Sequence, residues 1–126
     1  MSKDYSVKIV NTTKELTPKE RVAIKDLSDA KSLADLKENE TQIINVDYSA
    51  ELSIHNEQAE NKDYNVFVIV DKEGTKYYTS SQSFMSAYSN IADEMADYPD
   101  EEYSIKVFTK PSKNYKGKAF LTCTII

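Results

Sequence analysis

INVDYSAELSI, residues 44–54, is the stretch that decides the fold class of this chain. Its even positions are apolar and its odd positions are polar, from Ile44 to Ile54. Successive side chains of a β-strand point to opposite faces, so this alternation predicts a long strand with one face on a core and one in water. Tyr48 falls on the apolar side of the pattern, and we expect it in the core.

Four further strands and one helix are expected after residue 54. HNEQAENKD (55–63) is a polar loop, YNVFVIV (64–70) a more buried strand, DKEG (71–74) a turn with Gly74 at the positive-φ position, and TKYYTS (75–80) a third strand. Apolar residues at helical spacing follow from Phe84 to Met95, with Ser81 or Ser83 as the N-cap and Pro99 as the stop. YSIKVFT (103–109) and AFLTCTII (119–126) complete the strands.

The element order from residue 42 is therefore strand, strand, strand, helix, strand, strand. A mainly β protein with five strands and a helix between the third and the fourth has the order of an OB-fold, a partly open barrel that binds oligonucleotides and oligosaccharides. An α+β sandwich of the same elements remains possible.

The first 40 residues precede this barrel. YSVKIV (5–10) predicts a short strand, and LTPKERVAIKDL (16–27) a helix that starts at Thr17, with Pro18 in the first turn and Glu20 three residues after the cap. Apolar residues at 30, 33 and 36 extend the helical spacing, as one helix or two. We expect residues 1–40 to form a strand and helical extension packed on an OB-fold of residues 41–126, in a single globular domain.

Composition argues against several classes of protein. No apolar run approaches the ~20 residues of a membrane span, and no secretory signal is evident at the N-terminus. Cys123 is the one cysteine, so we expect no disulfide and a cytoplasmic protein. With one histidine, His55, and two glycines, neither a zinc site nor a glycine-rich phosphate loop is expected. We expect no cofactor, no metal and no enzymatic activity, with His55 at the surface and Cys123 buried.

Charge is distributed unevenly along the chain. Residues 1–102 hold 11 Lys and Arg against 21 Asp and Glu, whereas residues 103–126 hold five lysines and no acid. The net charge of −5 thus combines an acidic body with a basic end. This asymmetry indicates an anionic partner on one face, although a merely solvated lysine-rich hairpin would have the same composition.

Aromatic residues lie among the lysines of this basic end. Alternation places the last two strands' phenylalanines on the non-core side, beside lysines, and the loop between them adds a tyrosine. On the third strand a lysine and a tyrosine share one face. Exposed aromatics among lysines suit single-stranded nucleic acid, because every base can stack on a ring while lysines neutralise phosphates. The candidate contact residues are Lys76, Tyr78, Lys106, Phe108, Lys110, Lys113, Tyr115, Lys116, Lys118 and Phe120. The two phenylalanines could instead pack under the N-terminal helices.

Three segments carry a resemblance to a known family. TTKELTPKERVAIKDLSDAKSL (12–33), EGTKYYTSSQSF (73–84) and SKNYKGKAFLTC (112–123) resemble small single-stranded DNA-binding proteins encoded by phages of Gram-positive bacteria. The resemblance implies an OB-fold that coats single strands exposed during phage DNA replication or recombination. The chain departs from the family pattern at Asn114, Tyr115 and Lys116, where its loop is longer.

Two other functions fit the composition. The acidic body could imitate DNA and inhibit a host or defence enzyme, in which case the basic hairpin would be incidental. Alternatively, the exposed aromatics could be the interface of a homo-oligomeric structural module.

Overall fold

The computed structural model describes residues 5–37, 40–58, 60, 62–111 and 119–126. Strands dominate, and two α-helices and one short 3-10 helix accompany them. In chain order the elements are β1 (Tyr5–Thr12), α1 (Pro18–Lys25), β2 (Lys31–Ser32), η1 (Leu33–Asp35), β3 (Gln42–Asn56), β4 (Asp63–Asp71), β5 (Lys76–Thr79), α2 (Gln82–Met95), β6 (Tyr103–Pro111) and β7 (Ala119–Ile125).

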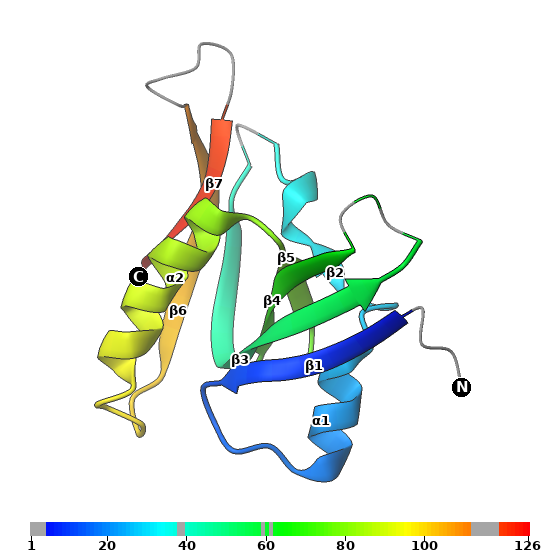
Figure 1. Ribbon diagram of the computed structural model, residues 1–126. Helices are drawn as coiled ribbons and strands as arrows, with labels where there is room; N and C mark the ends of the chain where they lie inside the picture. The colour runs from blue at the N-terminus through cyan, green and yellow to red at the C-terminus, as the bar shows by residue number, and fades with distance from the viewer. Residues whose placement is uncertain (1–4, 38–39, 59, 61, 112–118) are drawn as a thin grey trace.

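All the strands of the described chain belong to one sheet, which curls into a half-barrel (Figure 1). Its order is β2-β5-β4-β3-β6-β7, and β1 pairs with β3 beside this path. The pairs are antiparallel except the short parallel contact of β2 with β5. The prediction of a mainly β, barrel-like fold is confirmed. The sheet has seven strands rather than five, because β1 and β2, which precede residue 42, join it.

The central strand, β3, changes face halfway along its length. Its pairing with β4 is irregular between Val46 and Tyr48, where a β-bulge inserts an extra residue. A bulge reverses which positions face which side. Ile44 and Val46 therefore contact one core, whereas Tyr48 and the later even positions contact another. The prediction that all odd positions face water is wrong at Ser49, which is fully buried.

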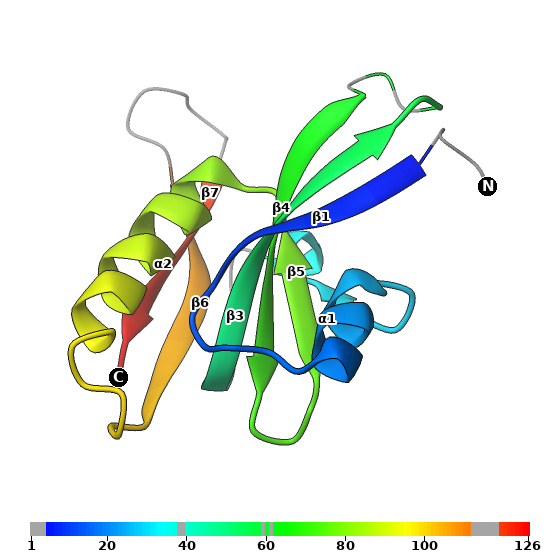
Figure 2. The same cartoon turned by 60° about the horizontal axis from the view of Figure 1, so that its bottom comes forward.

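Two hydrophobic cores result, one on each side of the sheet. The α2-side core lies inside the curl and gathers buried residues of β3 to β7 with Phe84, Met85 and Tyr88 of α2. The α1-side core lies on the other face of β3 and β4, under Leu16 and Ile24. Figure 2 shows α2 along β6 and β7 on the left, and α1 beside β5 on the right. Strand β4 is consequently buried on both faces, as its continuous apolar sequence predicts.

The helix caps follow the sequence closely. Thr17 accepts a hydrogen bond from the Glu20 backbone N–H, and the Glu20 carboxylate accepts one from the Thr17 N–H, which is a complete capping box. Ser81 caps α2. The helical stretch expected through residues 30–36 is instead the two-residue strand β2 followed by η1. No helix in the described ranges is long and apolar enough to cross a membrane.

The turn between β4 and β5 has the predicted conformation. The Asp71 carboxylate accepts hydrogen bonds from the backbone N–H groups of Glu73 and Thr75, and Gly74 has a φ of 90°. A residue with a side chain rarely adopts this φ, so glycine is required there. The turn fixes the register of β4 against β5 and thereby places Lys76 and Tyr78 on the side of α1.

Candidate nucleic-acid interface

One face of the sheet combines lysines, phenylalanines and small polar side chains. It is the outward side of β3, β6 and β7, turned away from the α2-side core, and we call it the basic face. Cross-strand pairing places its members side by side, since directly paired residues share a face. They are Ile43, Asn45, Ser104, Lys106, Phe108, Lys110, Phe120, Thr122 and Thr124. None of these residues is acidic.

Phe108 lies at the centre of the basic face with a lysine on either side along β6. The Lys106 ammonium lies 5.5 Å from the ring centroid and the Lys110 ammonium 5.8 Å from it. The ring is half-buried, so it is only partly covered by protein. Cation–π contacts of this kind contribute about 0.5–1 kcal/mol at exposed sites and keep the cations close to the ring.

Phe120 extends this arrangement onto β7. It pairs directly with Lys110 and is 38% exposed, while the buried Leu121 and Cys123 of the same strand point into the α2-side core. The sequence left open whether Phe108 and Phe120 pack under the N-terminal helices. Neither ring belongs to the two buried cores of the described residues.

The neighbouring strand β3 adds two residues that the sequence analysis did not single out. Ile43 pairs with Lys106 and is 46% exposed, and Asn45 pairs with Ser104. A signal was present in the sequence: Ile43 and Ile44 are adjacent in a strand, so only one of the two can face the core. The pairing of β3 with β6 places Lys106 beside Ile43, and this pairing cannot be read from the sequence.

Lys76 and Tyr78 lie apart from the basic face, on the α1 side of the molecule. The Lys76 ammonium donates to the backbone carbonyls of Ala23 and Asp26 and lies 3.0 Å from the Asp29 carboxylate. Its side chain is only 13% exposed. Tyr78 is half-buried against the α1-side core. The structure therefore does not bring these two residues together with the lysines of β6.

Tyr78 also lines a cavity of about 450 Å³ between β5, β2 and η1. Lys31, Gln42 and Tyr77 are among its other lining residues, and the Lys31 ammonium lies 6.0 Å from the Tyr77 ring centroid. Tyr77 is buried in the α2-side core, whereas Tyr78, on the opposite face of β5, is partly buried against the α1-side core.

Four of the candidate contact residues are outside the described part of the chain. Lys113, Tyr115, Lys116 and Lys118 fall in 112–118, between β6 and β7. Their roles stay predictions from sequence.

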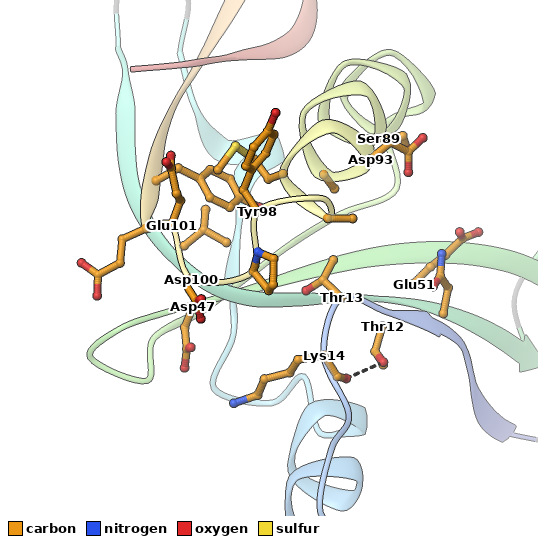
Figure 3. A pocket seen from close by; sticks show the side chains of 18 of the residues that line it. Thr12, Thr13, Lys14, Asp47, Glu51, Ser89, Asp93, Tyr98, Asp100 and Glu101 are labelled. Carbon is orange, nitrogen blue, oxygen red and sulfur yellow. Dashed lines mark hydrogen bonds between the residues drawn. The ribbon is translucent and has the colours of Figure 1, made fainter.

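A larger cavity, of about 620 Å³, lies between the C-terminal end of α2 and the strands β1 and β3. Figure 3 shows Asp47, Asp100 and Glu101 on one side of it and Glu51 and Asp93 on the other, with Tyr98 between them. Its two lysines are already paired, Lys14 with Glu20 at 3.3 Å and Lys72 with Glu102 at 2.6 Å. An acidic cavity repels phosphates, so this side of the molecule does not suit a nucleic-acid backbone.

His55 and Cys123 have different surroundings. His55 lies between two carboxylates, 2.7 Å from Asp63 and 2.6 Å from Glu57. Cys123 is buried and free, and burial raises the pKa of its thiol to about 12. Among the residues whose positions are given, no three His, Cys, Asp or Glu side chains could hold a metal ion.

A curled sheet with an acid-free, lysine-flanked aromatic face has the character of a nucleic-acid-binding module. Comparison with known families makes this specific. The family described as Phage Single-stranded DNA-binding protein, of the Phi29 type, matches residues 5–126, and the chain belongs to that family. This membership supports single-stranded DNA binding in general and confirms the resemblance seen in the sequence. No curated protein and no solved structure matches the chain.

Proposed function

We propose that the chain binds single-stranded DNA through the basic face, with Phe108 at its centre. The observation that carries this proposal is the position of Phe108 between the ammonium groups of Lys106 and Lys110, on a sheet face without acids. In the free protein the two lysines lie close to the ring. When a base stacks on Phe108, the lysines move from the ring to the flanking phosphates.

The energetics favour this exchange. A cation–π contact at an exposed site is worth about 0.5–1 kcal/mol, whereas stacking of a base on an aromatic ring is worth ~1–3 kcal/mol. Each phosphate neutralised by a lysine also releases condensed counterions, which adds a salt-dependent term. Phe120, opposite Lys110, offers a second stacking position. We propose that Lys113, Tyr115, Lys116 and Lys118 contribute further contacts from the loop that joins the two strands.

The fold is consistent with an OB-fold, which we propose for strands β3 to β7. Their order in the sheet is β5-β4-β3-β6-β7, with α2 between the third and the fourth in sequence. OB-folds often bind on the face of their second and third strands, here β4 and β5. In this chain Leu16 and Ile24 cover that side of β4, which leaves the basic face as the better-placed surface.

Lys76 contributes to structure rather than to DNA binding in this proposal, because its ammonium is occupied by α1. Tyr78 is at most a peripheral contact. We propose a binding protein without enzymatic activity, which coats exposed single strands during phage DNA replication or recombination in the host cytoplasm. The acidic side of the molecule, around the larger cavity, would disfavour wrongly placed phosphates.

The experiment is a binding titration of a fluorescently labelled mixed-sequence single strand, followed by anisotropy, with wild-type protein, F108L and F120A. We expect each variant to weaken binding by roughly 5-fold to 100-fold, as loss of one stacked base predicts. Y98A is the matched control, because Tyr98 is 55% exposed but lines the acidic cavity. If F108L and F120A bind like the wild type while their circular dichroism is unchanged, the basic face is not the binding surface.

A further inference from the structure

The edge of the basic face nearest the acidic side carries a hydrogen-bonded pair of polar residues. Asn45 of β3 and Ser104 of β6 are directly opposite each other, and the Ser104 hydroxyl donates to the Asn45 Oδ1 at 2.6 Å. Asn45 is exposed, as is Ile43 two residues before it on the same face.

The hydrogen bond from Ser104 fixes the orientation of the Asn45 amide. Because Oδ1 accepts from the hydroxyl, the amide presents its Nδ2 group, with two N–H donors, away from Ser104. No acceptor for Nδ2 is present among the residues that the structure describes. Asn45 is therefore an oriented donor at the surface, and its Nδ2 group suits an acceptor on a ligand.

Charge along the two strands indicates which kind of acceptor this is. On β6 the basic face includes Lys110, Lys106 and Ser104, in the direction toward the start of the strand. Glu102 lies just before the strand, two residues from Ser104. On β3, Asp47 likewise follows two residues after Asn45. Both acids are exposed, and Glu102 lies close enough to Lys72 to pair with it. A phosphate next to Asn45 would approach these carboxylates, whereas an uncharged base would not be repelled.

Ile43 points to the same conclusion. Alternate residues of a strand are about 6.5–7 Å apart, so an exposed apolar side chain lies one such step from the Asn45 donor and directly beside Lys106. A base can lay its ring over the isoleucine and turn its edge to the amide, while Lys106 contacts the adjacent phosphate. These contacts need one unpaired base and its phosphate, which a single strand provides.

We infer that Asn45, held by Ser104, is a specificity-determining residue that donates a hydrogen bond to the exocyclic carbonyl oxygen of a keto base, with thymine as the simplest case. This inference rests on the proposed function, because it requires the strand to lie on the basic face. The chain then prefers thymine over a base of the same shape without carbonyl acceptors.

The test compares two 12-nucleotide single strands. One is oligo(dT), and the other carries at every position the thymine isostere in which fluorines replace the two carbonyl oxygens. The isostere keeps the shape of thymine and still stacks but accepts hydrogen bonds poorly. Anisotropy gives both dissociation constants for the wild type, N45A, N45D, S104A and N65A. For each protein the ratio is the dissociation constant of the isostere strand divided by that of oligo(dT). Comparison of ratios between variants isolates the Asn45 contribution from other losses.

We expect the wild-type ratio to exceed that of N45A by roughly 3-fold to 10-fold, as one hydrogen bond predicts. N45D, which keeps the size of the side chain but has no donor, should lower the ratio as much, even though its charge weakens both complexes. S104A should lower it in part, because the amide is then free to turn. N65A is the control: the Asn65 amide on β4 already donates to Glu51, so the ratio should stay at the wild-type value.

An N45A ratio equal to that of the wild type overturns the inference. So does a wild-type ratio of one. Neither result bears on the proposed function, which fails separately if F108L binds oligo(dT) as tightly as the wild type.

Discussion

The ammonium nitrogen of Lys76 lies 2.9 Å from the backbone carbonyl oxygen of Ala23, although 53 residues separate the two in the chain. The same ammonium donates to the carbonyl of Asp26, where α1 ends, and pairs with Asp29. The last carbonyls of a helix have no partner within the helix, and a lysine is favourable at that end. Lys76 of β5 thus holds the C-terminal end of α1 against the sheet.

Replacing Lys76 by methionine should therefore reduce stability and spare DNA binding. Methionine keeps most of the side-chain length but removes the hydrogen bonds, and we expect the free energy of unfolding to fall by about 1–3 kcal/mol. Urea unfolding followed by circular dichroism measures this change. A K76M variant that is as stable as the wild type but binds single strands weakly would instead place Lys76 among the DNA contacts.

The lysines of β6 should set the salt dependence of binding. For single strands, the logarithm of the binding constant falls with the logarithm of salt concentration by ~0.7 for each phosphate neutralised. We expect K106Q and K110Q each to reduce this slope by about that amount. The measurement is an anisotropy titration at four or more salt concentrations. K8Q is the control, because Lys8 is an exposed lysine of β1, away from the basic face, and an equal loss of slope in K8Q would indicate only an effect of net charge.

His55 should make the end of the β3–β4 hairpin sensitive to pH. Its hydrogen bonds with Asp63 and then Glu57 raise the pKa of its imidazole above the ordinary 6.5, and Glu57 also pairs with Lys62. A raised pKa in the folded state means that the stabilisation is fully present below pH 6.5 and is lost as the pH rises through the folded pKa. Ser6 of β1, the residue opposite His55, carries no charge.

The stability difference between wild type and H55Q, measured by urea unfolding, should therefore be largest near pH 6 and shrink above pH 7. Below the ordinary pKa of Glu57, 4.5, the stability difference should shrink again, because Lys62 and then His55 lower the pKa of that carboxyl. A difference that does not vary between pH 5.5 and 8.5 would contradict this role for His55.

Cys123 should be unreactive in the folded protein. The thiolate is the reactive form, and burial raises the pKa of this thiol to about 12. We expect Ellman's reagent to modify less than one tenth of the thiol within minutes at pH 8, and all of it at once in 6 M guanidinium. Rapid modification of the folded protein would mean that β7 separates readily from α2, because the Cys123 side chain of β7 is buried in the α2-side core.

Several features of the fold were predictable because their causes are local. The Thr17–Glu20 capping box, the Ser81 cap and the glycine in the β4–β5 turn each depend on a few consecutive residues. The same holds for the two-sided burial of β4, which its unbroken apolar run predicts. The helix expected through residues 30–36 was wrong because a short apolar spacing does not distinguish a helix from a bend that is held by pairing with β5.

The candidate site was predictable only in part, for the same physical reason. Alternation along β6 and β7 identified Phe108, Lys106, Lys110 and Phe120 as neighbours on an outward face, and their pairing agrees. Lys76 likewise shares a strand face with an aromatic residue, Tyr78, yet its ammonium donates to the backbone of α1. A side chain's partner from a distant segment leaves no local trace in the sequence.

The sequence by itself determined the order of the elements from residue 42 onward, the helix caps, the acid-free C-terminal segment and the phenylalanines among its lysines. Only the tertiary structure decided that β3 carries a bulge between Val46 and Tyr48 and so serves two cores, and that Ile43 and Asn45 lie beside Lys106 and Ser104. Periodicity and capping act over a few residues and are written in the chain. Register and bulges arise from pairing between strands that are distant in sequence, where the packing of both cores selects one alignment.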